Sequence, residues 1–261
     1  MLAGCSLDRY PETQLPEDLF WNLNSADNYQ LAANYLYSLL SHRFVDCRAD
    51  DQVRRNYPDD ISAGTRKIPA TSNDWTLPYR MIFAANKIIG DTPIDEIQVD
   101  DIKKYIAEAH FFRAYAYFSL LTKYGGVPIL TEIPEDINDP ILYSERASRG
   151  DVVKLIYDNL DIAALNLPMP SDLENGTSTD WGRVMRTAAL AFKARVALYE
   201  GTHMKYHNEG NGSGHLKIAY ESASAVMTSQ KHELYTTGTE PYRTLFLYEG
   251  ENIPEIILPK I

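Results

Sequence analysis

Apolar positions recur most regularly between residues 99 and 124, at alternating spacings of four and three. This spacing places their side chains on one face of an α-helix, and the stripe comprises Ala107, Phe111, Ala114, Phe118 and Leu121. A second stripe beside it comprises Phe112, Ala116 and Leu120. A helix that is apolar on two faces must lie between neighbouring helices. We therefore predict a central helix that Gly125-Gly126 ends and that Pro128 prevents from resuming.

A weaker copy of this helix follows later in the chain. Residues 109–114 align with residues 189–194, so that Phe112 and Arg113 match Phe192 and Lys193. The copy is rich in alanine, which lets neighbouring backbones approach closely, as in stacked helical hairpins. Gly201 is predicted to end it. A repeated pair of helices is one interpretation of the match, and two unrelated core helices are the other.

Further segments show helical spacing of apolar residues, namely 26–40, 74–89, 149–166 and 216–229, while the alanine-rich copy covers 183–203. The stretches at 41–73, 129–148 and 168–180 have no sustained period and contain turn-forming residues. The sequence thus predicts an all-α fold of three antiparallel helix pairs with long irregular loops. These pairs form one domain over residues 25–261, after an extended lead-in at 1–24.

Composition narrows the classes of protein. The 261 residues are 44% hydrophobic, which is enough for a sizeable core. A formal charge of −11, with at most two consecutive Lys or Arg residues, argues against a nucleic-acid-binding surface and favours a neutral or cationic partner. No stretch approaches the roughly 20 apolar residues of a membrane-spanning helix. Because zinc spacings, phosphate-binding glycine motifs and a nucleophile elbow are missing from the sequence, we predict no metal and no cofactor.

Each end of the sequence contains a recognisable pattern, a lipobox-like motif at the start and a β-like run at the end. Leu2-Ala3-Gly4-Cys5 resembles the bacterial lipobox, in which cleavage precedes a Cys that is then acylated, so Cys5 is the predicted lipidation site. The charged and apolar regions of a signal peptide should precede this motif, and this sequence does not contain them. Residues 252–261 include a β-like run without a partner strand. We therefore expect the sequence to belong to a longer protein and to be truncated at its C-terminus.

An ordered series of motifs resembles the SusD/RagB family of outer-membrane lipoproteins from Bacteroidetes, and it spans essentially the whole chain. The motifs are Cys5 with Leu7-Asp8 and Pro11, Trp75 to Arg80 with Ala85-Asn86, Glu108-Ala109 with Arg113 to Tyr115, Tyr124 to Pro128, Arg183 with Ala188-Ala189 and Lys193 to Arg195, and Pro254 to Ile257. The resemblance implies a scaffold of tetratricopeptide-like helical-hairpin repeats, of which this chain is the N-terminal part.

The same resemblance implies a function. It points to a lipid-anchored protein at the cell surface of the outer membrane that captures an oligosaccharide without catalysis. The captured oligosaccharide would pass to a SusC-like, TonB-dependent transporter, over which the protein closes like a lid. The resemblance also places ligand contacts in the first loop between helices.

That loop, residues 41–73, carries the residue types that bind sugars. Aromatic faces stack on sugar C–H surfaces, while carboxylates and Arg hydrogen-bond to hydroxyl groups. The candidate ligand-binding residues fall close together in the sequence: Asp50, Asp51, Arg54, Arg55, Tyr57 and Asp59. The alternative is a solvated charged loop with internal ion pairs.

Other conspicuous residues are assigned to structure. Trp75 begins a helix whose apolar spacing continues through Tyr79, so we predict packing rather than a sugar platform. Arg113 lies between apolar stripes and is predicted to form an ion pair with another helix. The histidines at 203, 207 and 215 are interpreted as surface residues rather than metal ligands.

Two rival functions stay open at this point. A tetratricopeptide-type adaptor would bind a peptide or protein in its groove. An α-helical glycoside hydrolase would need a catalytic acid and base, and the paired carboxylates Asp50-Asp51 and Asp59-Asp60 are the available candidates. Adjacent residues rarely converge on one bond, so the sequence predicts a protein that is not an enzyme.

Overall fold

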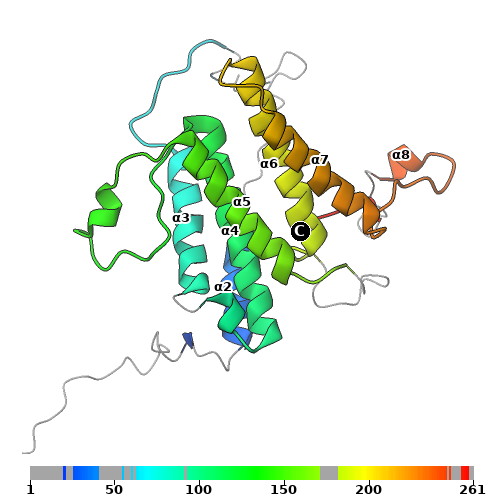
Figure 1. Ribbon diagram of the computed structural model, residues 1–261, viewed down its shortest axis with the longest axis horizontal. Helices are drawn as coiled ribbons and strands as arrows, with labels where there is room; N and C mark the ends of the chain where they lie inside the picture. Colours follow the sequence, from blue (N-terminus) through cyan, green and yellow to red (C-terminus); the bar gives the residue numbers. More distant parts are fainter. Residues whose placement is uncertain are drawn as a thin grey trace, which may run out of the picture.

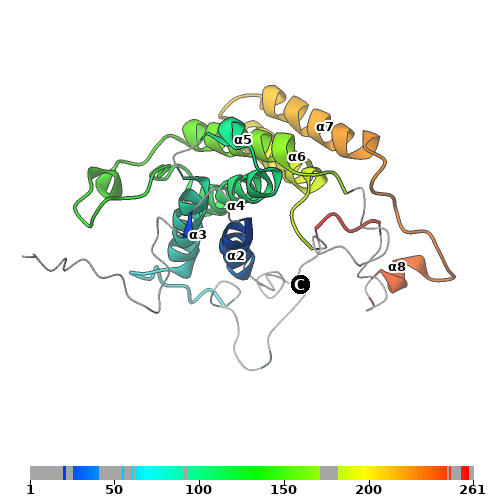
Figure 2. The same cartoon turned by 90° about the horizontal axis from the view of Figure 1, so that it is seen from below.

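Figures 1 and 2 show the computed structural model of the chain, which describes residues 20–21, 26–40, 55, 60, 63–90, 93–170, 182–245, 247 and 254–258. Every regular element within these ranges is helical, which confirms the predicted all-α fold. The elements are α2 (Ala26–Ser38), α3 (Asn73–Ile89), η2 (Ile94–Glu96), α4 (Asp100–Tyr124), η3 (Pro140–Tyr143), α5 (Arg149–Asn166), α6 (Arg186–Tyr206), α7 (Ser213–Thr228) and α8 (Pro241–Thr244).

The helices pack in the order in which they follow one another. α3 contacts α4, α4 contacts α5, α5 contacts α6, and α6 contacts α7. In Figure 2 these helices form a curved layer, with α2 below α4. α2 packs against both α3 and α4. This serial packing is compatible with stacked hairpins, whereas the tetratricopeptide-like repeat itself stays a prediction.

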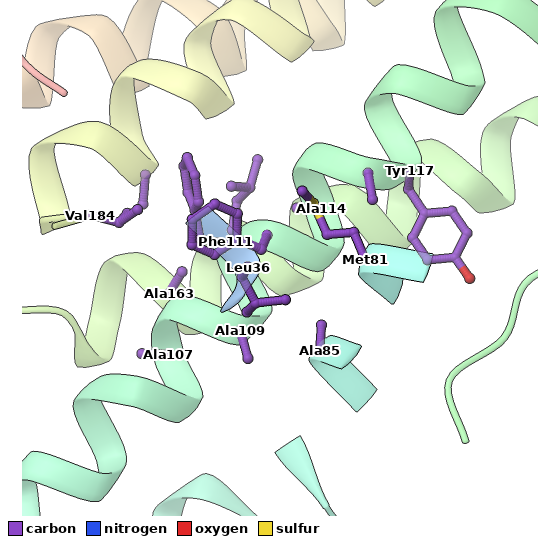
Figure 3. Close-up of a cluster of buried hydrophobic side chains, with 14 of the residues drawn as sticks. Leu36, Met81, Ala85, Ala107, Ala109, Phe111, Ala114, Tyr117, Ala163 and Val184 are labelled. Atoms are coloured by element: carbon purple, nitrogen blue, oxygen red, sulfur yellow. The ribbon is translucent and has the colours of Figure 1, made fainter. Parts of the chain in front are cut away.

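α4 is the central helix, as the two apolar stripes predict. Both stripes are buried along most of their length, and only Phe118 among them is half-buried. Figure 3 shows side chains from neighbouring helices gathered around α4, including Leu36 from α2, Met81 from α3 and Ala163 from α5. The core therefore surrounds α4 on all sides, and this helix fixes the positions of its neighbours.

The helix ends follow from local sequence. Ser72 caps α3 by accepting a hydrogen bond from the Asp74 N–H, and Ser148 caps α5 by accepting one from the Asp151 N–H. Gly125 ends α4 with a φ of 71°, a backbone conformation that side chains disfavour. The predicted bounds of α5, 149–166, agree with the observed helix.

Gly201 does not end the alanine-rich helix, so that prediction is wrong. α6 continues to Tyr206, and Gly201 is buried within it. A Cβ at this position would lie 2.8 Å from the Leu216 Cγ and 3.0 Å from the Gly212 carbonyl oxygen. Gly201 therefore permits the close crossing of α6 and α7 rather than a change of chain direction.

We expect Gly201→Ala to lower the free energy of unfolding by about 1–3 kcal/mol, because the added methyl group overpacks this crossing. Gly214→Ala is the matched control. Gly214 lies in α7, and a Cβ added there would have no other atom within 4 Å, so alanine should stabilise by up to about 1 kcal/mol. Chemical denaturation of the two variants measures both values. Equal effects from the two substitutions would contradict the close crossing.

The C-terminal β-like run is also a wrong prediction where the structure describes it. Residues 254–258 form turns and bends rather than a strand. The apolar side chains of Ile257 and Leu258 instead pack against the hydrophobic core. The β-branched sequence thus reflects burial against helices and not strand pairing.

Candidate functional site

The structure leaves most of the predicted ligand-binding residues untested. Arg55 is exposed. The other five candidates, Asp50, Asp51, Arg54, Tyr57 and Asp59, lie outside the described residues, as does Cys5. Residues 63–72 form the last part of this loop and reach the N-terminus of α3, where Ser72 provides the cap. The predicted loop site and lipidation site therefore stay predictions.

A cavity of about 470 Å³ lies between α4, α6 and the segment 254–258. We call it the α4–α6 cavity. Its lining is mainly apolar and comprises Leu40, Phe111, Tyr115, Ala188, Ala191, Phe192, Arg195, Glu255, Ile256, Ile257 and Leu258. Cavities with an apolar lining and a few charged groups are the usual form of small-ligand sites.

Phe192 forms the aromatic centre of the cavity wall. Its ring centroid lies 5.5 Å from that of Phe111, 5.6 Å from that of Tyr115 and 5.5 Å from that of Phe118. The ring planes are tilted or perpendicular, as aromatic pairs prefer. These contacts join α4 directly to α6 and give the wall a fixed shape.

His232 holds the opposite wall in place. Its Nδ1 donates to the Pro254 carbonyl oxygen at 2.9 Å, and its Nε2 lies 2.8 Å from the Thr187 hydroxyl oxygen. Because the carbonyl can only accept, the His232 Nδ1 carries a proton. The Glu255 side chain also accepts a hydrogen bond from the Tyr235 N–H. Segment 254–258 is therefore tied to the start of α6 on one side and to residue 235 on the other.

The lining of the α4–α6 cavity offers aromatic and charged groups to a ligand. Its aromatic rings can stack on an apolar surface, and the exposed Arg195 can donate hydrogen bonds at its edge. The cavity was missed at the level of sequence, because it forms only when segment 254–258 packs on α4 and α6. The one available signal was the apolar run Ile256 to Leu258, which was interpreted as a strand.

Glu108 and Arg183 form a buried ion pair. Arg183 donates from Nε to one Glu108 oxygen at 2.8 Å and from Nη2 to the other at 2.6 Å. A third donor, Nη1, reaches Asn34 on α2 at 2.6 Å. Burial raises the pKa of the Glu108 carboxyl, and the hydrogen bonds from Arg183 oppose that rise. The pair fastens the start of the α6 segment to α4 and α2.

A second buried polar cluster corrects the prediction for Arg113. This residue donates to amide oxygens rather than to a carboxylate: its Nε to Asn159 at 2.9 Å and its Nη1 to Asn86 at 3.0 Å. No salt bridge to Arg113 occurs within the described part of the chain. Burial lowers the pKa of the guanidinium to about 10. Asn86 also donates to the Leu130 and Glu132 carbonyl oxygens, so the cluster links α3, α4 and α5 to the connector after α4.

His110 completes this cluster and makes stability depend on pH. Its Nδ1 donates to the Asn159 oxygen at 2.8 Å. Burial, and next the charge of Arg113, lower its pKa to about 4. The folded protein therefore binds fewer protons than the unfolded chain between about pH 6.5 and pH 4. Stability contributed by the neutral ring is present above that window and decreases as the pH falls through it.

We expect the free energy of unfolding to fall by about 3 kcal/mol between pH 6.5 and pH 4 because of the protonation of His110 alone. His110→Gln removes this titration, so its free energy of unfolding should fall less steeply over the same range. His207→Gln changes an exposed histidine and serves as the control. Urea denaturation at several pH values measures the slopes. A slope in His110→Gln as steep as that of the unchanged chain would contradict the assignment.

Trp75 has the packing role that its spacing predicts. Its ring centroid lies 5.0 Å from that of Tyr124 in an edge-on arrangement and 5.0 Å from that of Tyr79, and it packs against the core. Tyr79 in turn donates its hydroxyl to the Pro128 carbonyl oxygen at 2.8 Å. Trp75 thus holds the end of α4 against α3.

The surface prediction holds for His207, which is exposed, whereas His203 and His215 are half-buried and contact neighbouring rings. The rings of His203 and His207 stack at 4.3 Å, and the His215 Nδ1 lies 2.8 Å from the Tyr157 hydroxyl. Within the residues that the structure describes, no cluster of three or more His, Cys, Asp or Glu residues could hold a metal ion. Nor does any helix in these residues have the length and apolar character needed to cross a bilayer.

The described part of the chain is thus an all-helical scaffold with an apolar cavity between α4 and α6. Residues 23–198 match a family described as SusD-like, "Starch-binding associating with outer membrane". The chain therefore belongs to the SusD-like family, which confirms the resemblance seen in the sequence motifs.

Curated relatives agree with this assignment. SusD-like protein P38 from Formosa agariphila is 29% identical over 99% of this chain and 50% of its own length. A SusD-like protein from Bacteroides ovatus is 28% identical over 99% of this chain and 47% of its own length. The chain thus spans about half the length of the curated relatives that it matches.

Solved structures show the same fold. A SusD-like protein from Bacteroides fragilis superimposes with a TM-score of 0.71 at 22% identity, over 92% of this chain and 45% of its own. Surface glycan-binding protein A from Bacteroides fluxus gives a TM-score of 0.65 at 21% identity, over 90% and 50%. A structure solved with xylogluco-oligosaccharide gives 0.63 at 24% identity, over 91% and 46%.

Proposed function

We propose that the protein to which this chain belongs captures oligosaccharides at the surface of the outer membrane and delivers them to a SusC-like, TonB-dependent transporter. Membership of a family described as starch-binding and associated with the outer membrane carries this proposal. The relative solved with xylogluco-oligosaccharide supports oligosaccharide as the ligand class. The acidic chain, with a formal charge of −11, suits neutral sugars better than anionic ones.

Capture without catalysis fits the buried carboxylates. A glycoside hydrolase needs two carboxyl groups that face the same bond. Glu108 accepts two hydrogen bonds from Arg183. Glu200 accepts three from Arg149, at distances from 2.7 to 3.1 Å. Each carboxylate is thus committed to an arginine inside the scaffold. These two carboxylates therefore do not form a catalytic pair.

The ligand contacts belong in the loop before α3. We place them at Asp50, Asp51, Arg54, Arg55, Tyr57 and Asp59, whose carboxylates, guanidinium groups and phenol ring are the groups that recognise sugar hydroxyls and ring faces. Arg55 is exposed, as this role requires. Cys5 would carry the lipid that anchors the protein to the membrane.

The loop assignment is tested by substitution. A variant with Asp50→Ala, Arg54→Ala and Tyr57→Ala should bind oligosaccharide at least about tenfold more weakly, because charged and aromatic contacts contribute most to such sites. Lys217→Ala with Glu221→Ala removes an exposed ion pair of α7 and is the control. Titration of both variants with the sugar that the unchanged protein binds gives the comparison. Unchanged affinity in the loop variant would overturn the assignment.

The lipid anchor has its own test. Cys5→Ser should abolish incorporation of a labelled fatty acid and release the protein from the outer-membrane fraction of cells. Cys47→Ser changes the other cysteine of the chain and should leave both properties intact. Persistent labelling of the Cys5 variant would show that this residue is not the acylated one.

The α4–α6 cavity supports a second candidate function, the binding of a peptide. Segment 254–258 already lies in this apolar space as an irregular chain whose Ile257 and Leu258 pack on the core. A peptide of similar character could occupy the remaining volume. Phe192→Ala should then abolish peptide binding and leave oligosaccharide binding unchanged, which separates the two functions in the same titration experiment.

A further inference from the structure

The end of α6 places two histidine rings face to face. His203 and His207 are four residues apart, and the His207 N–H donates to the His203 carbonyl oxygen at 2.9 Å, so helical spacing holds for both. Side chains at this spacing lie on the same side of a helix. The two ring centroids are 4.3 Å apart, and the turn that follows lies at the upper end of α6 in Figure 1. The two imidazoles therefore share one face at the end of the helix.

One nitrogen of the His203 ring lacks a hydrogen bond. This atom, Nδ1, is buried and has no hydrogen-bond partner among the described residues. A Glu209 carboxylate oxygen lies 3.6 Å away, which is beyond hydrogen-bonding distance. Because a carboxylate can only accept, it favours the ring tautomer with the proton on Nδ1 and the lone pair on Nε2. Nε2 is thus the His203 atom that is available to a cation.

The turn after α6 brings Glu209 back to His203. Asn208 has a φ of 59°, in the left-handed region that residues other than glycine seldom adopt. The chain reverses there, and the Glu209 N–H donates to the Met204 carbonyl oxygen at 2.9 Å. This hydrogen bond holds the backbone of Glu209 against the last turn of α6. The carboxylate therefore lies beside the His203 ring because of the way the helix ends.

This arrangement matches the way in which helical histidines bind metal ions. Two histidines at positions i and i+4 are the ligand pair of helical zinc motifs. A histidine that binds a metal commonly donates its other ring N–H to a carboxylate, and Glu209 stands in that position relative to His203. The carbonyl groups at the C-terminal end of α6 carry partial negative charge, which attracts a cation. Three features of this helix end thus favour a metal ion.

We propose that His203 and His207 bind one divalent transition-metal ion through their Nε2 atoms, while Glu209 accepts a hydrogen bond from the His203 Nδ1. Imidazole nitrogens suit Cu²⁺, Ni²⁺ and Zn²⁺. The lone pairs lie in the ring planes, so the exposed His207 ring turns out of the stack until its lone pair converges with that of His203. Water completes the coordination, which makes the site open, unlike a structural zinc site with four protein ligands.

The bound ion stabilises the end of α6, because it binds the folded arrangement of the two histidines in preference to the unfolded chain. The sequence predicts no metal, since two histidines at helical spacing do not reveal the carboxylate that the turn at Asn208 returns to them. The inference is independent of the proposed function.

The test is isothermal titration calorimetry of the whole gene product, without a histidine tag and after treatment with EDTA, against CuCl₂, NiCl₂ and ZnCl₂. His207→Gln removes one ligand, and Glu209→Gln removes only the charge of the carboxylate. Both residues are exposed, so both variants should keep the circular dichroism spectrum of the unchanged protein. His215→Gln is the control, because the His215 Nδ1 lies 2.8 Å from the Tyr157 hydroxyl, away from the proposed ligand pair.

The unchanged protein should bind Cu²⁺ most tightly of the three ions. His207→Gln and Glu209→Gln should each bind at least about tenfold more weakly, and His215→Gln should bind normally. Electron paramagnetic resonance of bound Cu²⁺ should show two imidazole nitrogens in the unchanged protein and one in His207→Gln, a difference that a loss of stability would not produce. Equal affinity in His207→Gln, or binding of all three ions only above about 1 mM, would overturn the site. Equal affinity in Glu209→Gln would overturn the role of the carboxylate.

Discussion

Arg183→Met is expected to lower the free energy of unfolding by about 3–5 kcal/mol, among the largest effects of any single substitution in this chain. Glu108 is fully buried, and Arg183 supplies both of its charge-assisted hydrogen bonds, so methionine leaves a buried carboxylate without its ion-pair partner. Asn34 loses its donor at the same time. Urea denaturation followed by circular dichroism measures the change.

The pH dependence of this variant separates the buried charge from lost packing. Without Arg183, burial raises the pKa of Glu108 further above its usual value of about 4.5. The folded variant then binds a proton that the unfolded chain releases, so its stability decreases as the pH rises from about 4.5 toward neutrality. The free energy of unfolding of Arg183→Met should fall below that of the unchanged protein by a larger amount at pH 8 than at pH 5.

Two further variants complete the test of the ion pair. Glu108→Gln combined with Arg183→Met should recover part of the lost stability, because no buried charge remains. Lys154→Met breaks an exposed ion pair with Asp158 and should change stability by less than about 1 kcal/mol. A deficit in Arg183→Met that is the same at pH 5 and pH 8 would contradict the role assigned to Glu108.

Phe112→Ala is expected to lower the free energy of unfolding by about 3–5 kcal/mol, because it opens a cavity at the centre of the core. The Phe112 ring is completely buried and lies edge-on to Tyr37 at 4.7 Å and to Phe111 at 5.5 Å. It therefore joins α2 to α4. Loss of this ring removes both aromatic contacts along with the apolar area.

Phe83→Ala is the matched control for the core. Phe83 lies on α3 and is 45% exposed, so the same truncation should cost less than about 1.5 kcal/mol. Thermal and chemical denaturation compare the two variants directly. If Phe112→Ala is no more destabilising than Phe83→Ala, α4 is not the centre of the core.

The sequence predicted α4 and its burial because the apolar signal there is local and continuous. Two stripes at helical spacing can only be satisfied by neighbours on both sides, and the observed packing of α2, α3 and α5 on α4 agrees. The ends of α5 could also be predicted from the sequence, since Ser148 is a strong capping residue and the helical period of the apolar residues ends at Asn166. Local chemistry fixed these features.

Features that depend on contacts between residues far apart in the chain could not be predicted from the sequence in this way. Gly201 carries the sequence signal of a helix end, but its role is set by Leu216 of α7 and by Gly212, the residue before that helix, both of which approach it closely. Arg113 appeared to need a carboxylate, but the carbonyl oxygens of Asn86 and Asn159 satisfy it from two other helices. Residues 254–258 resemble a strand until their packing on the helices is known. In each case, tertiary contacts decide among several local possibilities.

For the candidate site too, features carried by local sequence could be predicted and features formed by distant contacts could not. The motif series predicted the family correctly, because it extends over most of the chain and the family match covers residues 23–198. The six candidate ligand residues rest on residue types and on the resemblance, and only the exposure of Arg55 bears on them in the structure. The α4–α6 cavity was not predictable, since it joins residues near position 111 to residues near position 256.

The central claim is that the protein binds an oligosaccharide and leaves it intact. Isothermal titration of the whole gene product against a panel of oligosaccharides, with chromatography of the sugar after each titration, tests it most directly. We expect saturable binding of at least one oligosaccharide, recovered at its original length. Cleaved sugar would identify a glycoside hydrolase, and binding confined to peptides would identify an adaptor; either result would contradict the claim.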